Sequence, residues 1–356
     1  MTVQQERAPC DDGSRPDIDH CPSCSSPSGT VLFSTRDRLR GQPGTFEVLE
    51  CSDCQLARIR PVPTHDATTL NLEWIRDDGT PGMVRRLINS GRQLAAARMA
   101  KVIWGCARRG TVLDMGGGAL LGSALRQRGL AVVAAAPTAR PASSRFSPAG
   151  ILVVQSRLPD GCFRRGTFDV IVGKHVLEHE REPRIALDAM LEMLAPNGSL
   201  VIQVPNANSW QAVLLAGAWA GFDIPRHPVS FDDASLERLL ESCGLLVASR
   251  RTGSVFEAAF CLATSLCPWL DPDLRQIRCV REHRIVQELK DLFYCLIAIA
   301  LSPLTFLELA SDSGPAIVVE ARRASHDVPK ANLQRSDDEA TKPKAAGVPA
   351  PEEHGR

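Results

Sequence analysis

Apolar positions along the chain change their period near residue 111. Over residues 83–109 they recur at helical spacing, which predicts a long amphipathic helix. From Thr111 onward, short apolar runs alternate with amphipathic stretches. The runs predict strands at 112–113, 131–136, 151–154, 167–173, 197–205, 245–250 and 316–322. Strands that alternate with helices predict an α/β sheet, largely parallel, that binds ligands at the carboxyl ends of its strands.

The helices between these strands carry terminal signals. Residues 119–128 are followed by Gly129, which suits the position just after a helix, and residues 183–194 open on Pro183. Residues 232–244 begin on a capping aspartate and end on glycine. These signals support the alternation of helices and strands.

Composition narrows the class of protein. Lys+Arg and Asp+Glu balance at 41 each in 356 residues, and there is no basic aromatic patch, which argues against a nucleic-acid partner. Residues 1–19 are polar and lack a secretory signal, so we expect a cytoplasmic protein with reduced thiols. The polar compositions of residues 1–19 and 324–356 predict disorder. The oligomeric state stays open.

Residues 20–63 contain two C-x-x-C pairs, "CPSC" and "CSDC". Their four thiolates, Cys21, Cys24, Cys51 and Cys54, can meet one structural zinc ion. The intervening residues contain a plausible hairpin with strands at Val31–Phe33 and Phe46–Leu49. The pattern therefore favours a zinc-ribbon module. A redox pair or chance spacing is the alternative.

The stretch "VLDMGGGALLGSALRQRGLAVVAAAP" (112–137) has the form of a strand, a glycine turn, a helix and a second strand. A glycine turn alone is weak, but "FDVIVGKHVLEHEREPRIALDAMLEMLAPNGSLVIQVPN" (168–206) and "FDIPRHPVSFDDASLERLLESCGLLV" (222–247) follow it. Together they resemble class I S-adenosylmethionine-dependent methyltransferases. An N-terminal cysteine module before such a domain is similar to a bacterial subgroup of these enzymes.

The resemblance covers about residues 20–323 and implies a Rossmann-like α/β fold. Its seven-stranded sheet would have an antiparallel last strand and helices on both faces, in a domain over 83–323. It implies S-adenosyl-L-methionine as cofactor. The positions that match the family's cofactor-binding residues are Asp114, Gly116, Gly117, Gly118, Ala136, Arg157, Leu158 and Lys174.

Three departures from the family pattern weaken this match. The third glycine of the turn is replaced by Ala119–Leu120, and the acid that holds the ribose hydroxyls is Ala136. Pro141 and Pro148 oppose the helix that the resemblance places after the second strand. We therefore expect weak cofactor binding. The lost charged contact is worth about 1.5–3 kcal/mol, or tenfold to a hundredfold in affinity.

Histidines gather near the expected site. "HVLEH" supplies His175, Glu178 and His179 on one turn, and "PRHP" supplies His227 on a loop. These four residues are the catalytic candidates, as a general base beside the acceptor or as ligands of a second metal ion. The alternative is structural: Glu178 caps, His179 packs under the sheet edge and His227 bonds a carbonyl.

Two late apolar segments, 254–270 and 292–307, lie between the sixth and seventh expected strands. The second has 16 residues interrupted by Ser302 and Pro303, short of the roughly 20 that span a bilayer. The insertion over 254–307 is either an interfacial hairpin with peripheral membrane contact or a helical cover of the core.

The sequence therefore predicts methyl transfer from S-adenosylmethionine to a small-molecule, sugar or lipid-linked acceptor. A catalytically weak or inactive scaffold with the same fold is the alternative. A membrane-associated location in the cytoplasm follows if the apolar insertion contacts lipid.

Overall fold

The computed structural model describes residues 20–62, 82–136, 143–147, 150–155 and 163–324. One compact unit ends at Arg323, and a second comprises Ala324–Arg356. The disorder expected for residues 1–19 lies outside the described residues, as does that of the tail after Ala324. The description below concerns the first unit.

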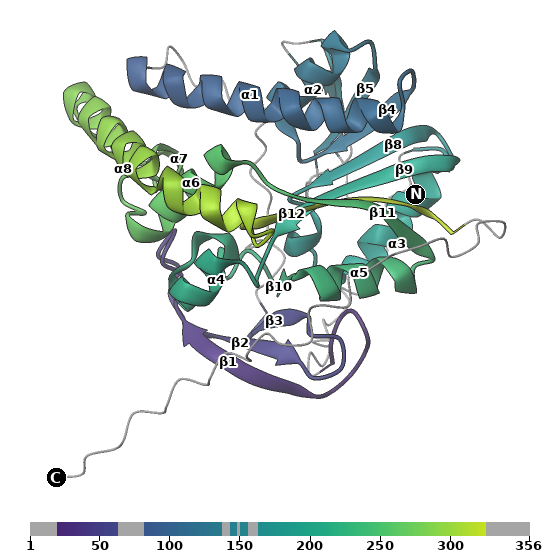
Figure 1. Ribbon diagram of the computed structural model, residues 1–356, viewed down its shortest axis with the longest axis horizontal. Helices are drawn as coiled ribbons and strands as arrows, with labels where there is room; N and C mark the ends of the chain where they lie inside the picture. The colour runs from purple at the N-terminus through teal and green to yellow at the C-terminus, as the bar shows by residue number, and fades with distance from the viewer. Residues whose placement is uncertain (1–19, 63–81, 137–142, 148–149, 156–162, 325–356) are drawn as a thin grey trace, which may run out of the picture. The chain divides into compact units, whose positions relative to one another are not determined.

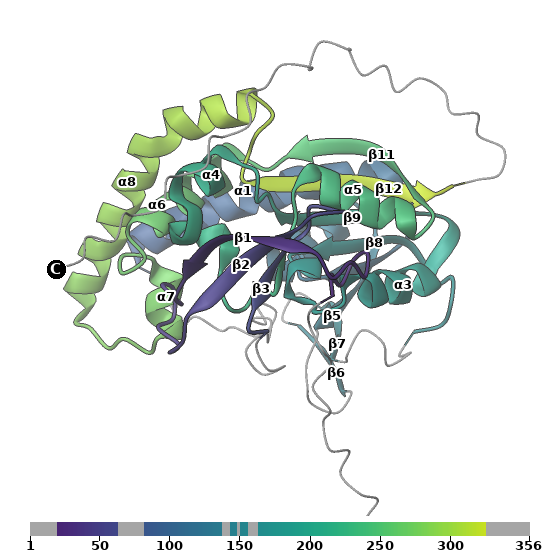
Figure 2. The same ribbon diagram turned by 90° about the horizontal axis from the view of Figure 1, so that it is seen from below.

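A central sheet of eight strands has the order β11-β12-β9-β8-β4-β5-β7-β6 (Figures 1 and 2). Neighbours from β9 to β7 run parallel, and β12 lies antiparallel between β9 and β11. The strands are β4 (Thr111–Met115), β5 (Ala131–Ala136), β6 (Ser143–Phe146), β7 (Leu152–Gln155), β8 (Phe168–Lys174), β9 (Leu194–Pro205), β11 (Leu245–Thr252) and β12 (Ala316–Arg323). This confirms the predicted Rossmann-like sheet with its antiparallel last strand.

The eighth strand was not predicted. β6 pairs antiparallel with β7 at the sheet edge, in the stretch where the resemblance places a helix. Pro141 and Pro148 flank this stretch, and proline opposes helix formation. A short edge strand tolerates flanking prolines because its outer side needs no ladder hydrogen bonds.

Alternating strand residues build two cores on opposite faces of the sheet. Val112, Val170 and Val172 pack with residues of α1 (Met83–Cys106) and α2 (Gly118–Gln127). Leu113 and Ile171 pack with α3 (Pro183–Met193) and α5 (Asp233–Ser242). Figure 1 shows the two pairs of helices on opposite sides of the sheet. Strands buried on both faces explain why the sequence runs are continuously apolar.

The cysteine-bearing segment forms a second sheet with the order β1-β2-β3-β10. β1 (Gly29–Thr35) and β2 (Phe46–Cys51) form an antiparallel hairpin, and β3 (Ala57–Arg60) pairs with β2. The fourth strand, β10 (Val229–Ser230), comes from the middle of the chain and pairs with β3. Sequence analysis did not anticipate β3 or this shared sheet.

The insertion after β11 is helical and contains α6 (Val255–Leu266), α7 (Pro272–Ile277) and α8 (Arg284–Ala310). α8 has 27 residues and continues through Pro303, so the expectation of a 16-residue segment interrupted there was wrong. It is the one described helix long and apolar enough to cross a membrane: its most apolar stretch has a mean hydropathy of 2.0 and is 28% buried. The remaining helices are α4 (Trp210–Leu215) and short 3-10 turns at Leu177–His179, Ala216–Ala218 and Ala220–Phe222.

Candidate functional site

The turn between β4 and α2 requires glycine at its first position. Gly116 has φ +95°, and a Cβ there would lie 2.1 Å from the Lys174 carbonyl oxygen. Gly118 also has a positive φ, of +74°. Asp114 is fully buried beneath the turn, and its Oδ1 accepts a 2.8 Å hydrogen bond from the Gly117 amide. The carboxylate thus fixes a bare backbone that a ligand can approach closely.

The residues expected to hold the cofactor lie at one edge of the sheet. β4, β5 and β8 are adjacent and parallel, so their carboxyl ends, at Met115, Ala136 and Lys174, meet there. Ala136 is the last residue of β5 and is paired with Gln155 of β7. The expected adenine contacts, Arg157 and Leu158, lie outside the described residues. The described part of this edge fits a cofactor at its glycine turn and supplies no carboxylate at position 136.

His175 follows β8 directly and has an unusual backbone. Its φ is +53°, a left-handed conformation that costs a residue with a Cβ about 1–2 kcal/mol. Its ring is 40% exposed, and its Nδ1 lies 2.8 Å from Oε1 of Glu178, whose side chain is 1% exposed. Since a carboxylate only accepts hydrogen bonds, Nδ1 carries the proton and Nε2 keeps a lone pair. A strained, partly exposed imidazole oriented by a buried carboxylate is suited to proton transfer.

Glu178 stays ionised despite its burial. Burial alone would raise its pKa, but the hydrogen bond from His175 and the nearby rings of His227 and His179 hold the pKa below its usual range. Its second oxygen, Oε2, has no hydrogen-bond partner in the described part of the chain. The carboxylate therefore presents a buried acceptor to its surroundings.

His179 and His227 stack edge to face with ring centres 4.5 Å apart. Nδ1 of His179 donates to the Arg226 carbonyl oxygen at 3.1 Å, and Nδ1 of His227 donates to that of Gly221 at 2.9 Å. Burial and the neighbouring His227 ring lower the pKa of His179 to about 4, so it is neutral near pH 7. Ligand atoms of both histidines and of Glu178 lie within 4.8 Å of one another. Because both Nδ1 atoms donate to carbonyls, Nε2 is the acceptor that each neutral ring can offer beside the carboxylate.

Lys174 occupies the position beside the glycine turn, but its side chain engages the insertion. Its Nζ lies 3.2 Å from Oε1 of Glu257, in the first turn of α6. Burial would raise the pKa of Glu257, and Lys174 together with the Ser254 hydroxyl holds it below its usual range. The ion pair therefore ties α6 to the sheet edge that carries the candidate site.

Arg226, which sequence analysis did not single out, connects the cysteine-bearing segment to the histidine loop. Its Nη1 and Nη2 donate to the two carboxylate oxygens of Asp37 at 2.8 and 3.0 Å, and it also pairs with Asp223. The side chains of Arg226 and Asp37 are 3% and 0% exposed. Asp37 further accepts backbone hydrogen bonds from Leu39, Arg40 and Gln42. Although burial opposes ionisation, these contacts hold the pKa of Asp37 below its usual range.

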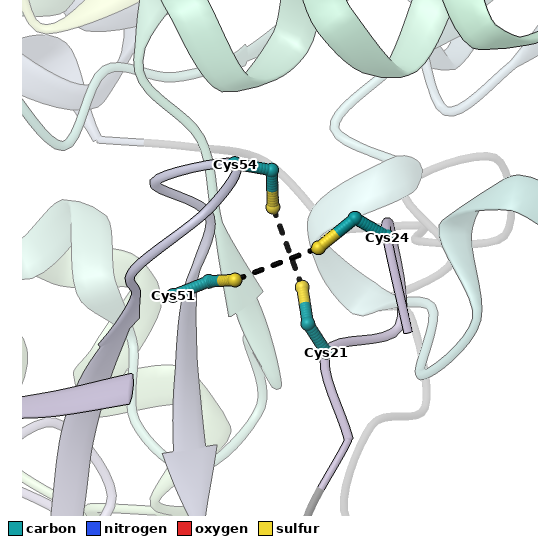
Figure 3. A group of neighbouring side chains, drawn as sticks. All are labelled: Cys21, Cys24, Cys51 and Cys54. Carbon is teal, nitrogen blue, oxygen red and sulfur yellow. Dashed lines mark hydrogen bonds between the residues drawn. The ribbon is translucent and has the colours of Figure 1, made fainter. Parts of the chain in front are cut away.

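The four cysteines converge on a common centre (Figure 3). Sγ of Cys21 lies 3.4 Å from that of Cys54, and Sγ of Cys24 lies 3.5 Å from that of Cys51. Four sulfurs around a tetrahedral zinc ion at 2.3 Å lie about 3.8 Å apart, close to these spacings. Disulfide sulfurs would be about 2.05 Å apart, so the thiols are free.

The two C-x-x-C turns share one backbone geometry. Ser25 and Gln55, which follow the second cysteine of each turn, have φ of +62° and +64°. Their amides donate to the carbonyl oxygens of Cys21 and Cys51 at 2.8 and 3.0 Å. Burial opposes ionisation of Cys51, but the backbone amides of Cys54 and Asp53 lower its pKa to about 6. Each turn thus aims two sulfurs inward, and the second turn supports a thiolate at Cys51, the form that binds metal.

A comparison with protein families identifies the domain that carries this site. Residues 84–249 match a family described as "Methyltransferase domain". Together with the strand order, this match identifies a methyltransferase domain with the fold of class I S-adenosylmethionine-dependent methyltransferases. The matched segment is the methyltransferase domain of the chain, and it contains the glycine turn, His175, Glu178, His179 and His227. A comparison with curated proteins gives no match.

Among solved structures, the chain is similar to a possible histamine N-methyltransferase from Thermotoga maritima, with 11% identity and a TM-score of 0.40 over 67% of this chain and 92% of that one. It is similar to coclaurine N-methyltransferase, with 12% identity and a TM-score of 0.42 over 74% and 80% of the two chains. It is also similar to the 1,6-didemethyltoxoflavin-N1-methyltransferase of Burkholderia thailandensis, with 15% identity and a TM-score of 0.39 over 77% and 98%. With such low scores, the assignment rests on the family match and the strand order.

Replacing Arg226 with methionine should lower the free energy of unfolding by about 3–5 kcal/mol, because Asp37 would be left buried without its cation and Asp223 would keep only Arg40, 3.9 Å away. The measurement is urea unfolding at neutral pH. The control is Arg60→Met, which breaks an exposed pair with Glu47 and should cost less than about 1 kcal/mol.

The contacts of Arg226 with Asp37 and Asp223 also make the free energy of unfolding depend on pH. The folded-state pKa values of Asp37 and Asp223 are lowered, so their contribution is present above the ordinary Asp pKa of about 3.9 and is lost as the pH falls below it. The difference between wild type and Arg226→Met should therefore shrink in acid. A difference that grows in acid would contradict this assignment.

Proposed function

We propose that the chain transfers a methyl group from S-adenosylmethionine to a hydroxyl of a small-molecule, sugar or lipid-linked acceptor, and that His175 removes the hydroxyl proton. The observation that carries the proposal is the His175–Glu178 pair at the carboxyl end of β8, next to the turn at Gly116. A sulfonium methyl group needs no metal or acid to activate it, so the enzyme's tasks are positioning and proton removal.

The glycine turn supports cofactor binding because Gly116 to Gly118 leave the backbone bare and Asp114 holds it in place. When bound, S-adenosylmethionine supplies an electrophilic methyl group. Met115, Ala136 and Lys174 end the three strands that would bound its site. Since Ala136 offers no charged acceptor to the ribose, we expect weaker binding than in relatives with an acid there.

His175 would accept the acceptor's proton at Nε2, while Glu178 holds Nδ1–H and stabilises the imidazolium that forms. Gln203 Nε2 lies 3.4 Å from this Nε2 and helps to orient the ring. His179 and His227 are poorer bases, because both are more buried and their Nδ1 protons are held by carbonyls. Glu178 acts through His175 and is a positioning residue.

A second candidate role, divalent cation binding, is favoured by the three acceptors that converge from Glu178, His179 and His227. Neutral imidazole nitrogens and a carboxylate suit zinc and other transition metals. A cation there would satisfy Oε2 of Glu178 and draw the acceptor hydroxyl toward His175. Loss of this cation would raise the pKa of the acceptor hydroxyl and would leave the cysteine cluster intact.

We also propose that Cys21, Cys24, Cys51 and Cys54 hold a structural zinc ion. A closed set of four thiolates leaves no open position for chemistry. Arg238 of α5 donates to the Cys54 carbonyl oxygen at 2.7 Å, so the second turn is fastened to the methyltransferase domain. Free thiols also support a reducing, cytoplasmic location.

Replacing His175 with alanine should lower kcat by about a hundredfold to ten-thousandfold, the range typical of a lost general base. Cofactor affinity, measured by calorimetry, should stay unchanged. Rates are followed by S-adenosylhomocysteine release with an acceptor found by screening sugars and hydroxylated lipids. Glu178→Gln should move the rising limb of the pH–rate profile to lower pH, because the neutral amide no longer stabilises the protonated imidazole of His175. The control is His283→Ala, an exposed histidine before α8, which should change neither kcat nor the profile. An unchanged kcat in His175→Ala would remove it from the mechanism.

Purified protein should contain one equivalent of zinc by elemental analysis, and Cys51→Ser should lose it and melt at a lower temperature because the module's folding depends on the metal. His227→Ala serves as the control, since it should retain this zinc. A second metal equivalent that only His227→Ala abolishes would establish the cation site of the histidine cluster. Metal-free protein of full stability would refute the zinc proposal.

Ala136→Asp should tighten S-adenosylmethionine binding at least about tenfold, because it restores a charged acceptor at the end of β5. The control is Ala131→Asp at the opposite end of the same strand, which should leave Kd unchanged. Calorimetry with S-adenosylmethionine and S-adenosylhomocysteine measures both. If neither the native chain nor Ala136→Asp binds at millimolar cofactor, the scaffold hypothesis replaces catalysis.

A further inference from the structure

The outward side of α8 is apolar over almost its whole length. We define the outer face of α8 by six residues that recur every three, four or seven positions: Ile285, Leu289, Leu292, Leu296, Ile299 and Phe306. Each is between 43% and 64% exposed, and Ile285, Leu289 and Leu292 line an open groove together with Met83 and Val84 of α1. At 1.5 Å per residue the face is about 30 Å long. A surface helix of a soluble protein ordinarily shows polar residues there.

Two acidic residues of α8 point the opposite way. Asp291 is buried in an ion pair with Arg275 of α7. Glu308 is 1% exposed, and its carboxylate accepts hydrogen bonds from the backbone and side-chain nitrogens of Gln211, at 3.1 and 2.8 Å. The inner side of the helix therefore carries two partnered acids beside an apolar cluster that includes Tyr294, Cys295 and Ala298, whereas the outer side is apolar and exposed. These two contacts fasten both halves of α8 to the rest of the fold.

A backbone detail within the outer face fits an environment without water. Pro303 has no amide hydrogen, so the carbonyl oxygen of Ile299 lacks its helical donor. Ser302 replaces it, with its hydroxyl donating to that oxygen at 2.7 Å. In water this carbonyl could be hydrated, whereas in a lipid environment a donor from the protein is needed.

From these observations we propose that the outer face of α8 docks flat onto a lipid bilayer, with its apolar residues among the acyl chains near the headgroups. The helix lies in the plane of the bilayer and does not span it, because its inner side carries Asp291 and Glu308 in protein contacts. Arg281 and Arg284 are exposed at its N-terminal end, where headgroup phosphates would meet them. α6 is largely buried. The proposal therefore gives the membrane contact to α8 alone and not to a hairpin of the segments 254–270 and 292–307.

A second copy of the chain suits this face less well. Helix pairs select partners through charged residues beside the apolar seam. From Leu292 to Leu307 the sequence of α8 contains no charged residue, and Phe293 and Leu307 widen the exposed apolar stripe. A wide stripe without flanking charges matches a fluid apolar surface. This proposal is independent of the methyl-transfer proposal.

The test is flotation of the full chain with vesicles of phosphatidylcholine, with and without phosphatidylglycerol. Wild type should float, and more so with the anionic lipid because of Arg281 and Arg284. Ile299→Glu should reduce the partition coefficient at least about tenfold. The matched control is Ile185→Glu: Ile185 is an exposed isoleucine of α3, 51% exposed against 62% for Ile299, and its replacement should not affect flotation.

Three results would overturn the proposal. The first is wild-type protein that stays at the bottom of the gradient with both vesicle types. The second is equal loss of flotation in Ile299→Glu and Ile185→Glu. The third is a dimer in light scattering that Ile299→Glu converts to a monomer while neither protein floats, which would assign the face to a second copy. Melting temperatures of both variants equal to that of wild type exclude unfolding as the cause.

Discussion

The Arg226 side chain is the contact on which the arrangement of the site depends. It is buried between Asp37, from the cysteine-bearing segment, and Asp223, from the loop that carries His227. Its own carbonyl oxygen holds His179 in one tautomer. One residue therefore sets the position of the N-terminal module and the orientation of the histidine cluster. A buried arginine with two acids is costly to assemble, and removing the arginine leaves Asp37 buried without a cation.

The sheet could be predicted because its strands are buried on both faces and its helices carry terminal signals. Pro183, Gly129 and the cap at Asp232 occupy the expected helix ends. Pairings between distant segments could not be predicted. β3 is four residues long and is defined by its pairing with β2 and β10. β6 pairs with β7 in the stretch where the resemblance implied a helix, which Pro141 and Pro148 oppose. The spacing of apolar residues within one segment reveals neither of these pairings.

The parts of the site that could be predicted are those that depend on the spacing of residues along the sequence. The C-x-x-C pairs indicated a cluster, and the turn between β4 and α2 indicated close backbone approach. Which histidine is suited to be the base was not predictable, because it depends on φ at His175, on exposure and on which carbonyl holds each Nδ1. Arg226 and Asp37 looked ordinary, since the sequence separates them by most of the chain. The partner of Lys174, Glu257, comes from an insertion that the bare fold does not require.

The pairing of β3 with β10 has a consequence for how the protein is made. The cysteine-bearing segment leaves the ribosome before β10, yet its sheet is completed by Val229 and Ser230, and the carboxylate of Asp37 has no partner until Arg226 has been made. Until these residues emerge, the nascent module exposes to water the unpaired edge of β3 and the carboxylate of Asp37, which is buried in the folded protein. Early capture of a metal ion by its thiolates would hold the unfinished module together during that interval. With the proposed zinc site, translation order would make metal supply a condition of productive folding.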